Sequence, residues 1–421
     1  MALIVQKYGG SSVCGPERIR AVAQRVVDTR RAGHEVVVVV SAMGDTTDEL
    51  LDLASQVAGA PQARELDVLL TAGESVSSAL LAIAVNDLGQ RACALSGSQA
   101  GIVTTGTHGT ARIVDVLPMR VRRELACGSV AVVAGFQGVC QSTEDVTTLG
   151  RGGSDTTAVA LAAALGADVC EIYTDVDGVC TADPRIAPNA RLLSRLGYEQ
   201  MLELAAHGAK VLMPRCVEYA RRHRVRVHVR SSYSARPGTL VIGSLEEHKM
   251  EQPLIIGVAH DLSEVKFAVT GIPSRTGGAT SILRVLADAR IELGMVVQNI
   301  STLGAKLTDL TLTLPREDSR LAIGLLHSHR DVSGFSSVSC DEQIGRVSLI
   351  GTGMRGEPGI AATFCEAMTS VGINVEMLST SESRISAICR GADVDDAVRA
   401  LHDAFGLGSD QTAVVYAGTG R

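Results

Sequence analysis

The chain has 421 residues, is 46% hydrophobic and has only 3% aromatic residues, so two or three domains with cores of Ala, Val, Leu and Ile are expected. A formal net charge of −7 without a basic block argues against nucleic acid or an anionic membrane surface as a partner. The sequence has no signal-peptide pattern, no apolar run of the ~18–20 residues that span a membrane, and ten isolated cysteines, which together predict a protein of the reducing cytoplasm.

The first forty residues have the pattern of a βαβ unit. Residues 2–8 are apolar and β-prone, and a glycine turn, Gly9 and Gly10, follows them. Pro16 suits the first turn of a helix whose apolar residues fall on one face: Ile19, Val22, Ala23, Val26 and Val27. Residues 36–40 form a continuous apolar strand, which is typical of a sheet covered on both faces. This order predicts an α/β fold with a mostly parallel sheet.

Lys7 lies where the first strand ends, just before the glycines. The order of residues differs from the Gly-x-x-x-x-Gly-Lys phosphate loop, so Lys7 is either a surface charge or a ligand contact in the crevice of the sheet. Residues 41–49 lead through polar caps into a second helix. Residues 71–74 are expected to begin another helix, with Glu74 as an acid at its start. Further strands are predicted at residues 92–96, 130–135 and 169–174.

A glycine-rich loop at residues 147–157 precedes an Ala-, Val- and Leu-rich run that predicts a buried helix over residues 158–165. Gly166 offers a helix stop. Three side chains of the loop are expected to cap the first turn of this helix: Ser154, Asp155 and Thr156.

The same loop has the composition of an anion-binding site. Three glycines let backbone N–H groups approach a ligand closely: Gly150, Gly152 and Gly153. Arg151 adds a planar, charged fork that suits a carboxylate. A plain glycine turn is the alternative, but the combination within one loop favours a site for a small anionic substrate, a phosphate, or both.

The remaining part of the first half is rich in turns. Residues 175–185 carry three acids and an arginine, and an amphipathic helix near residues 198–208 precedes Lys210. Residues 235–253 have the composition of a linker.

The half after about residue 250 contains an internal repeat. Four landmarks recur, each 82 residues later: Gly271, Gly277, Ile291 and Met295 as Gly353, Gly359, Ile373 and Met377. Each copy has the order strand, glycine loop, helix, strand, strand, helix, which fits a βαββαβ unit. The two copies resemble paired ACT domains, the amino-acid sensors of biosynthetic enzymes.

The chain as a whole resembles the aspartate kinases of the amino-acid kinase family. The motifs are Lys-Tyr-Gly-Gly-Ser-Ser at 7–12, Gly-Arg-Gly-Gly-Ser-Asp-Thr-Thr at 150–157, Thr-Asp-Val-Asp-Gly-Val at 174–179 and Ala-Asp-Pro-Arg at 182–185. The resemblance implies a catalytic domain with a three-layer, mostly parallel sheet at residues 1–245, followed by ferredoxin-like ACT domains at 254–335 and 336–421.

It also implies an activity, namely transfer of the γ-phosphoryl group of ATP to the β-carboxylate of L-aspartate. Lys7 would hold phosphate oxygens, Asp155 would orient Lys7, Arg151 would bind the substrate α-carboxylate and Glu74 its α-ammonium group. The other substrate positions would be Thr47, Gly152, Gly153 and Ser154. The other ATP positions would be Gly9, Gly10, Ser41, Tyr173, Thr174, Asp175, Cys180, Asp183, Arg185 and Lys210. Mg²⁺ would bridge phosphates through water and phosphate oxygens, and the sequence indicates no dedicated protein ligand for the metal.

Amino-acid effectors would bind the ACT copies near Gly277, Ala279, Gln298, Asn374, Val375 and Ser381. The family also implies a homo-oligomer, or an α2β2 assembly whose smaller subunit would start at Met250. The chain departs from the family pattern at Cys180, where Tyr is usual, and in the first ACT copy at Thr276, where Pro is usual, and at residues 292–294, which read Glu-Leu-Gly where Asn-Ile-Asp is usual. The longer side chain of Glu292 is a candidate substitute for the missing Asp. These departures predict weaker nucleotide contact and weaker feedback regulation. Two alternatives are a kinase for a related amino acid and a catalytically inactive sensor.

Overall fold

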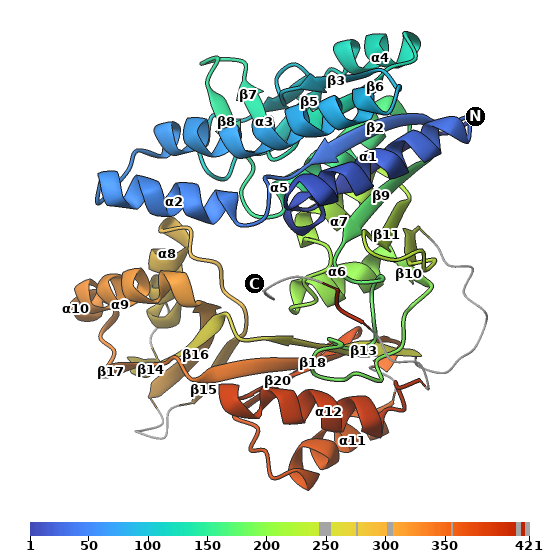
Figure 1. Cartoon of the computed structure of the whole chain (residues 1–421). Helices are drawn as coiled ribbons and strands as arrows, with labels where there is room; N and C mark the ends of the chain where they lie inside the picture. Colours follow the sequence, from blue (N-terminus) through green and yellow to red (C-terminus); the bar gives the residue numbers. More distant parts are fainter. Residues whose placement is uncertain (244–253, 275–276, 301–305, 355–356, 410–413, 417–421) are drawn as a thin grey trace. The chain divides into compact units, whose positions relative to one another are not determined.

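The computed structural model describes the chain except for residues 244–253, 275–276, 301–305, 355–356, 410–413 and 417–421 (Figure 1). The chain divides into two compact units. Unit 1 comprises Met1–Glu251 together with Ser409–Arg421, and unit 2 comprises Gln252–Gly408.

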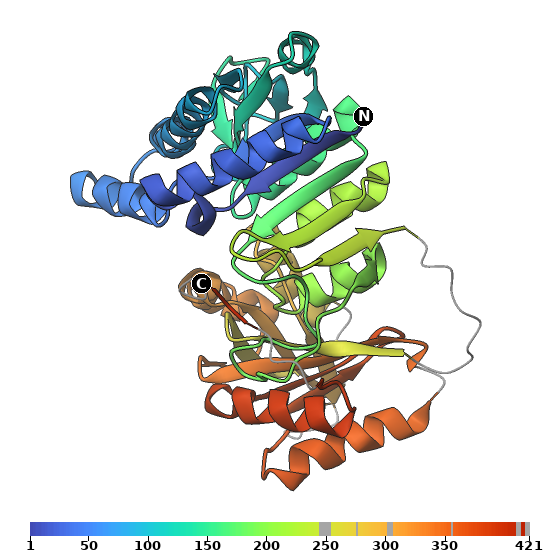
Figure 2. The ribbon, with the colours of Figure 1, turned by 45° about the vertical axis from the view of Figure 1, so that its right-hand side comes forward.

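Unit 1 is built on a sheet in the order β10-β12-β11-β9-β1-β2-β6-β3. Its strands are β1 (Leu3–Tyr8), β2 (Glu35–Val40), β3 (Ala92–Leu95), β6 (Val130–Ala134), β9 (Val169–Thr174), β10 (Arg195–Gly197), β11 (Val227–Ser231) and β12 (Thr239–Ile242). All neighbouring strands are parallel except β11 and β12. Figure 2 shows β1, β9 and β11 following one another across this sheet, from blue to light green. The predicted parallel α/β fold is confirmed.

Helices cover both faces of the sheet. They are α1 (Pro16–Arg31), α2 (Thr46–Val57), α3 (Ala63–Asp87), α4 (Met119–Ala126), α5 (Gly153–Leu165), α6 (Tyr198–Ala206) and α7 (Pro214–His223). On one face, α1 and α3 pack over a core that includes Tyr8, Tyr173 and alternate valines of β2. On the other face α5 contacts β1, β2 and β9. The continuous valine run of β2 follows from this double burial.

A second, smaller sheet in unit 1 leads into the glycine-rich loop. Its order is β5-β4-β7-β8, and its strands are β4 (Ile102–Thr104), β5 (Ile113–Val116), β7 (Gln137–Cys140) and β8 (Val146–Thr148). The glycine-rich loop follows Thr148, the last residue of β8, which pairs with Gln137 of β7. The start of the loop is therefore held by this sheet.

The start of α3 differs from the prediction. We expected a helix to begin at residues 71–74, but α3 spans Ala63–Asp87 and Glu74 lies in its middle. Gly73 serves close packing rather than a helix start, since a Cβ placed there would lie 2.7 Å from the Cβ of Ala42. By length and composition α3 could cross a membrane, but it packs on α1, β3 and β6 and buries two acids, Asp67 and Glu74.

The start of α5 also differs. The helix begins at Gly153, and Gly152 occupies the N-cap position with φ 68°. The three expected capping residues, Ser154, Asp155 and Thr156, therefore lie inside the first turn. None of them caps the helix, because the glycine backbone itself makes the turn, and the Thr156 hydroxyl donates to the Gly152 carbonyl at 3.2 Å.

Part of the expected linker, residues 235–253, forms a strand of the sheet. β12 occupies Thr239–Ile242 within it and pairs with both β10 and β11. Residues 244–253, which include Met250, lie outside the described part of the chain.

Unit 2 contains two four-stranded antiparallel sheets, in the orders β15-β16-β14-β17 and β13-β18-β20-β19. The strands are β13 (Leu254–Asp261), β14 (Glu264–Pro273), β15 (Val296–Ile300), β16 (Leu307–Pro315), β17 (Ser337–Asp341), β18 (Ile344–Thr352), β19 (Met377–Thr380) and β20 (Arg384–Arg390). The helices are α8 (Gly278–Asp288), α9 (Ser319–Ser328), α10 (Arg330–Ser333), α11 (Pro358–Ser370) and α12 (Val394–Ala404).

The two copies exchange their outer strands. β13 precedes β14 in the chain but pairs with β18 of the second copy, while β17 precedes β18 but pairs with β14 of the first. The expected ranges 254–335 and 336–421 therefore do not separate the two sheets. Arg346 on β18 fixes the exchange, because its guanidinium group pairs with Asp261 at the end of β13 and with Glu264 at the start of β14.

Candidate active site

The candidate site lies where β1, β2 and β9 end. The parallel register places Lys7 beside Val39 and Ile172, and the side chain of Lys7 faces α5. Its Nζ lies 2.5 Å from Oδ1 of Asp155, and the two side chains are only 12% and 10% exposed. The structure thus brings together two of the residues that the sequence singles out, as an ion pair at the first turn of a buried helix.

The glycine turn after Lys7 is held from two sides. The Gly9 N–H donates to the Tyr173 carbonyl at 3.4 Å, and the Gly44 N–H donates to the Gly10 carbonyl at 3.1 Å. A Cβ at Gly10 would lie 2.9 Å from the Ala42 carbonyl oxygen. Glycine is required here because the turn after β2 leaves no room for a side chain.

Glu74 reaches the same region from the middle of α3. It is 3% exposed, and its Oε1 accepts the Ala42 N–H at 3.0 Å. Its Oε2 has no hydrogen-bond partner among the described residues. Burial raises the pKa of the Glu74 carboxyl to about 7, and the bond from the Ala42 N–H partly opposes this shift. A buried carboxylate with one unused oxygen is suited to accept an N–H from a ligand.

The Arg151 loop is fixed by close backbone packing. A Cβ at Gly152 would lie 2.0 Å from Cγ of Met213. Arg215, in the first turn of α7, donates to the Leu149 carbonyl at 2.8 Å. The Arg151 side chain itself is exposed, so its guanidinium fork is available to a ligand.

Asp67 is a supporting residue that the sequence reasoning missed. It is 1% exposed on α3 and accepts the Thr148 hydroxyl at 2.5 Å and the Gly109 N–H at 3.0 Å. It also lies 2.7 Å from Nδ1 of His108. Asp67 therefore ties α3 to the strand that enters the glycine-rich loop. The available signal was an acid on the same helical face as Leu70 and Glu74.

The residues expected around ATP lie on several elements. At the end of β9, the Thr174 hydroxyl donates to Asp175 at 2.9 Å. The ring of Tyr173 stacks on Tyr8 with centroids 4.7 Å apart, in the core on the α1 face of the sheet. Lys7 faces α5, so Tyr173 presents only its backbone to the glycine turn.

Asp183 and Arg185 are paired with each other, with Nη2 of Arg185 2.6 Å from Oδ2 of Asp183. Cys180 is half-buried in a bridge to Leu192, and burial raises the pKa of its thiol to about 12.

The other expected positions lie on separate elements. Ser41 follows β2 and its N–H donates to the Tyr8 carbonyl at 3.1 Å, Thr47 lies in the first turn of α2, and Lys210 is exposed after α6. Among the described residues no group of three or more His, Cys, Asp or Glu side chains could hold a metal ion.

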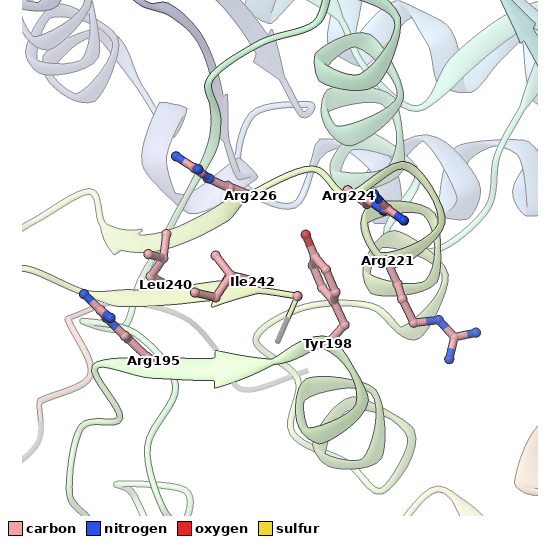
Figure 3. Close-up of a pocket in the computed structure, with 8 residues that line it drawn as sticks. Arg195, Tyr198, Arg221, Arg224, Arg226, Leu240 and Ile242 are labelled. Atoms are coloured by element: carbon pink, nitrogen blue, oxygen red, sulfur yellow. The ribbon is translucent and has the colours of Figure 1, made fainter. Parts of the chain in front are cut away.

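A separate cavity of about 630 Å³ lies near the edge strands of the sheet (Figure 3). It is lined by Arg195, Tyr198, Arg221, Arg224, Arg226, Leu240, Ile242 and Gly243. Arg226 comes just before β11, which runs parallel to β9 and β1. The cavity therefore lies at the start of β11 and at the ends of β10 and β12, whereas Lys7 is near the end of β1.

In the first ACT copy, α8 begins after Gly277, which has φ 99°. A Cβ at Gly294 would lie 2.5 Å from Oγ1 of Thr313 and 2.6 Å from Oε1 of Glu264. Glu264 is already bonded to Arg346 at 2.9 Å. A side chain at Gly294 would therefore have to displace Thr313 or Glu264, which lie at the opposite end of β14 from Gly277.

The remaining expected effector residues are described, whereas Thr276 lies outside the described residues. Ala279 lies in α8, Gln298 in β15, Asn374 and Val375 between α11 and β19, and Ser381 after β19.

Known proteins match the chain over its whole length. The amino acid kinase family model matches residues 2–231, and an ACT domain model matches residues 347–405. The aspartokinase of Mycobacterium tuberculosis is 61% identical over 421 residues, which is 100% of both chains.

Two crystal structures are also similar. The aspartate kinase from Synechocystis is 41% identical with a TM-score of 0.54, covering 96% of this chain and 70% of that one. Aspartokinase III of E. coli, in complex with aspartate and ADP, has a TM-score of 0.83 at 24% identity, covering 96% of this chain and 100% of that one, and therefore supports the fold.

Proposed function

The chain belongs to the amino acid kinase family and, within it, to the aspartokinases, and from this premise we propose how its residues bind and position the substrates. The reaction transfers the γ-phosphoryl group of ATP to the β-carboxylate of L-aspartate and gives 4-phospho-L-aspartate. This is the first step towards lysine, threonine, methionine and isoleucine. Phosphoryl transfer needs little covalent help from a protein, and its catalysis rests on positioning and on neutralised charge.

Lys7 is the residue that meets the transferring group. The observation that carries this assignment is its buried ion pair with Asp155 next to the glycine turn. Asp155 holds the ammonium group of Lys7 in one orientation, and the N–H groups of Gly9 and Gly10 lie in the turn that follows. A preorganised positive charge stabilises the extra negative charge of the transition state without reorganising at the moment of reaction.

Glu74 and Arg151 bind the amino-acid end of aspartate. The unused Oε2 of Glu74 accepts an N–H from the α-ammonium group, and the exposed fork of Arg151 binds the α-carboxylate as a bidentate pair. The ammonium group also favours the ionised form of Glu74, so substrate binding lowers the raised pKa of that carboxyl. Thr47 and Ser154 complete the site at the starts of α2 and α5, with Gly152 and Gly153 supplying backbone contact.

The nucleotide is bound at the ends of β9 and β1. Thr174 and Asp175 follow the strand that contacts Gly9, and Cys180, Asp183 and Arg185 lie in the loops beyond. Lys210 supplies a further charge to the phosphates. Mg²⁺ brought in with ATP would neutralise phosphate charge at this site.

Regulation acts through unit 2. Amino-acid effectors bind the ACT copies, and the second copy is the stronger site because the first has Gly294 where the family usually has Asp. The enzyme is cytoplasmic and works as a homo-oligomer or with a second subunit started at Met250. Intact mass analysis of the product of the native gene decides the last point.

A hydroxamate assay tests the proposed function. The protein is incubated with ATP, Mg²⁺, hydroxylamine and a panel of amino acids, and an acyl phosphate is trapped as a hydroxamate. Hydroxamate from aspartate alone supports the proposal. Hydroxamate from a different amino acid would change the acceptor, and no hydroxamate from any would contradict the activity.

A further inference from the structure

The last described residues of the chain return to unit 1. Val415 forms an antiparallel bridge with Val176, and the Tyr416 N–H donates to the Asp175 carbonyl at 2.9 Å. These contacts add one isolated β-bridge to the loop that follows β9. The Tyr173 carbonyl, at the end of β9, accepts the Gly9 N–H. This loop therefore starts beside the glycine turn that follows Lys7.

The side chain of Tyr416 makes a second connection to that turn. Its ring stacks on Tyr233 with centroids 5.8 Å apart and planes 10° apart. The Tyr233 hydroxyl donates to the Ser11 carbonyl at 2.8 Å, and the guanidinium group of Arg18 lies 4.2 Å from the Tyr233 ring centroid. Ser11 belongs to the short helix η1 (Gly10–Val13), so the Tyr233–Tyr416 pair is connected to the glycine turn through the Ser11 carbonyl.

A buried carboxylate anchors the loop on its other side. Asp177 is 4% exposed and accepts the Ser234 hydroxyl at 2.5 Å and Nη1 of Arg236 at 3.2 Å. The Tyr416 hydroxyl lies 3.4 Å from the same carboxylate and adds a long, weak bond. The loop carrying Thr174 and Asp175 is therefore held at the Asp177 side chain by Ser234 and Arg236. Its backbone is held by Val415 and Tyr416.

We infer that Tyr416 is a positioning residue for the nucleotide. It orders the loop at Asp175 and, through Tyr233, the turn at Gly10, and it does so without touching the substrate. The inference rests on the proposed nucleotide site and extends it. Tyr416 follows α12 of the second ACT copy in the chain, so the end of the regulatory unit is covalently continuous with a segment that shapes the ATP site.

The energetics of this contact give the expected size of the effect. The stacked ring and the backbone hydrogen bond of Tyr416 both hold the loop, and removing the ring takes away the stack. Without the Tyr416 ring, the loop at Asp175 is less ordered before the nucleotide binds. Part of the binding energy of the nucleotide is then spent on ordering this loop. The KM for ATP should rise about three- to tenfold when the ring is removed, while the KM for aspartate stays within about twofold.

The test compares three full-length variants with the native enzyme. Tyr416→Ala should raise the KM for ATP as stated, and ADP titrated calorimetrically should bind correspondingly more weakly. Tyr416→Phe should behave almost as the native enzyme, because it keeps the stacked ring and loses only the long bond to Asp177. Tyr219→Ala is the matched control, since Tyr219 stacks on His223 in α7 and has no part in the tail contact.

Asp175→Ala is measured in parallel to separate the two proposals. A raised KM for ATP in Asp175→Ala with an unchanged value in Tyr416→Ala would overturn the role of the tail and leave the nucleotide site in place. No change in either variant would overturn both. An equal rise of both KM values in Tyr416→Ala, with a lowered Tm, would reduce Tyr416 to a general stabilising residue and also overturn the inference.

Discussion

Two helices of this chain begin in the same way and differ in what surrounds them. α5 begins after Gly152 with φ 68°, and α8 begins after Gly277 with φ 99°. Both glycines adopt the left-handed conformation, and both helix starts can attract an anion. At α5 the first turn is buried and faces the Lys7–Asp155 pair. In the first ACT copy Gly294 follows the other end of α8 and is packed against Glu264 and Thr313.

The difference shows that a helix start is only part of an amino-acid site. A free amino acid carries an ammonium group as well as a carboxylate, so its site needs an unpaired acid. In the proposed aspartate site of unit 1 that acid is Glu74, whose Oε2 has no hydrogen-bond partner among the described residues. In the first ACT copy Gly294 stands where the family usually has Asp, and Glu264 beside it is bonded through Oε1 to Arg346 at 2.9 Å.

The largest effect is expected for Lys7→Met. Turnover should fall about 10²–10³-fold, because a preorganised charge at the transferring group is lost. Asp155 would then be buried without its partner, so a lower Tm is also expected. The double variant Lys7→Met/Asp155→Asn should recover Tm and not turnover, and near-native kcat in either variant would remove Lys7 from the mechanism.

Glu74→Gln should raise the KM for aspartate about tenfold or more, since a charged hydrogen bond of about 1.5–3 kcal/mol is lost. In the native enzyme the KM for aspartate should fall as the pH rises through about 7, where Glu74 ionises. The variant should lack this dependence. A steady-state pH series with both proteins checks the prediction, and the same pH profile in the variant would assign the titration to another group.

The same shift predicts how stability changes with pH. The folded pKa of Glu74 is raised from 4.5 to about 7, so its contribution to stability is complete below pH 4.5 and is lost as the pH rises towards 7. Glutamine carries no such penalty. Relative to the native protein without substrate, Glu74→Gln should therefore gain stability between pH 5 and 8, by at most about 3 kcal/mol. Denaturant unfolding at both pH values measures this gain.

Arg151→Lys should raise the KM for aspartate about fivefold to tenfold, and more than the KM for ATP. Lysine keeps the charge but loses the bidentate fork, which we take as about 1 kcal/mol. Arg226→Lys is the control, because Arg226 comes just before β11 and lines the separate cavity. If Arg151→Lys affects both substrates equally, the arginine supports the loop rather than the substrate.

Gly294→Asp should have the smallest effect on activity and should lower the Tm of unit 2. Its Cβ would meet Thr313 and Glu264 within 2.6 Å, which corresponds to overpacking of about 1–3 kcal/mol. Gly324→Asp, in α9, is the control because a Cβ there meets nothing within 4 Å. A variant Gly294→Asp of native stability would contradict the close packing at Gly294.

The sequence predicted the parallel sheet because its cause is local: apolar runs bounded by glycine turns. It also singled out Lys7 and Asp155, which the structure brings together as an ion pair between the end of β1 and the first turn of α5. It misplaced the start of α3 because Gly73 looks like a helix boundary, whereas its absent side chain accommodates Ala42.

Long-range partners could not be predicted. The 82-residue repeat does not indicate that β13 pairs with the second copy and β17 with the first. The repeated residues mark positions within each copy, whereas the pairing of an outer strand depends on which sheet edge it meets in the folded chain. Asp67 and Tyr416 act through partners 81 and 239 to 241 positions away, such as Thr148, Asp177 and Asp175. Only the folded chain brings these residues together.

The most direct test of the comparison is the initial rate of hydroxamate formation from aspartate, measured with no effector and then with millimolar threonine, lysine, and both together. The proposed site at α5 and the missing acid at Gly294 of the first ACT copy predict aspartate-dependent hydroxamate at a rate that both effectors together reduce by less than about half, which is under 1 kcal/mol of coupling. Absence of hydroxamate, or strong inhibition by threonine at ordinary concentrations, would contradict the account.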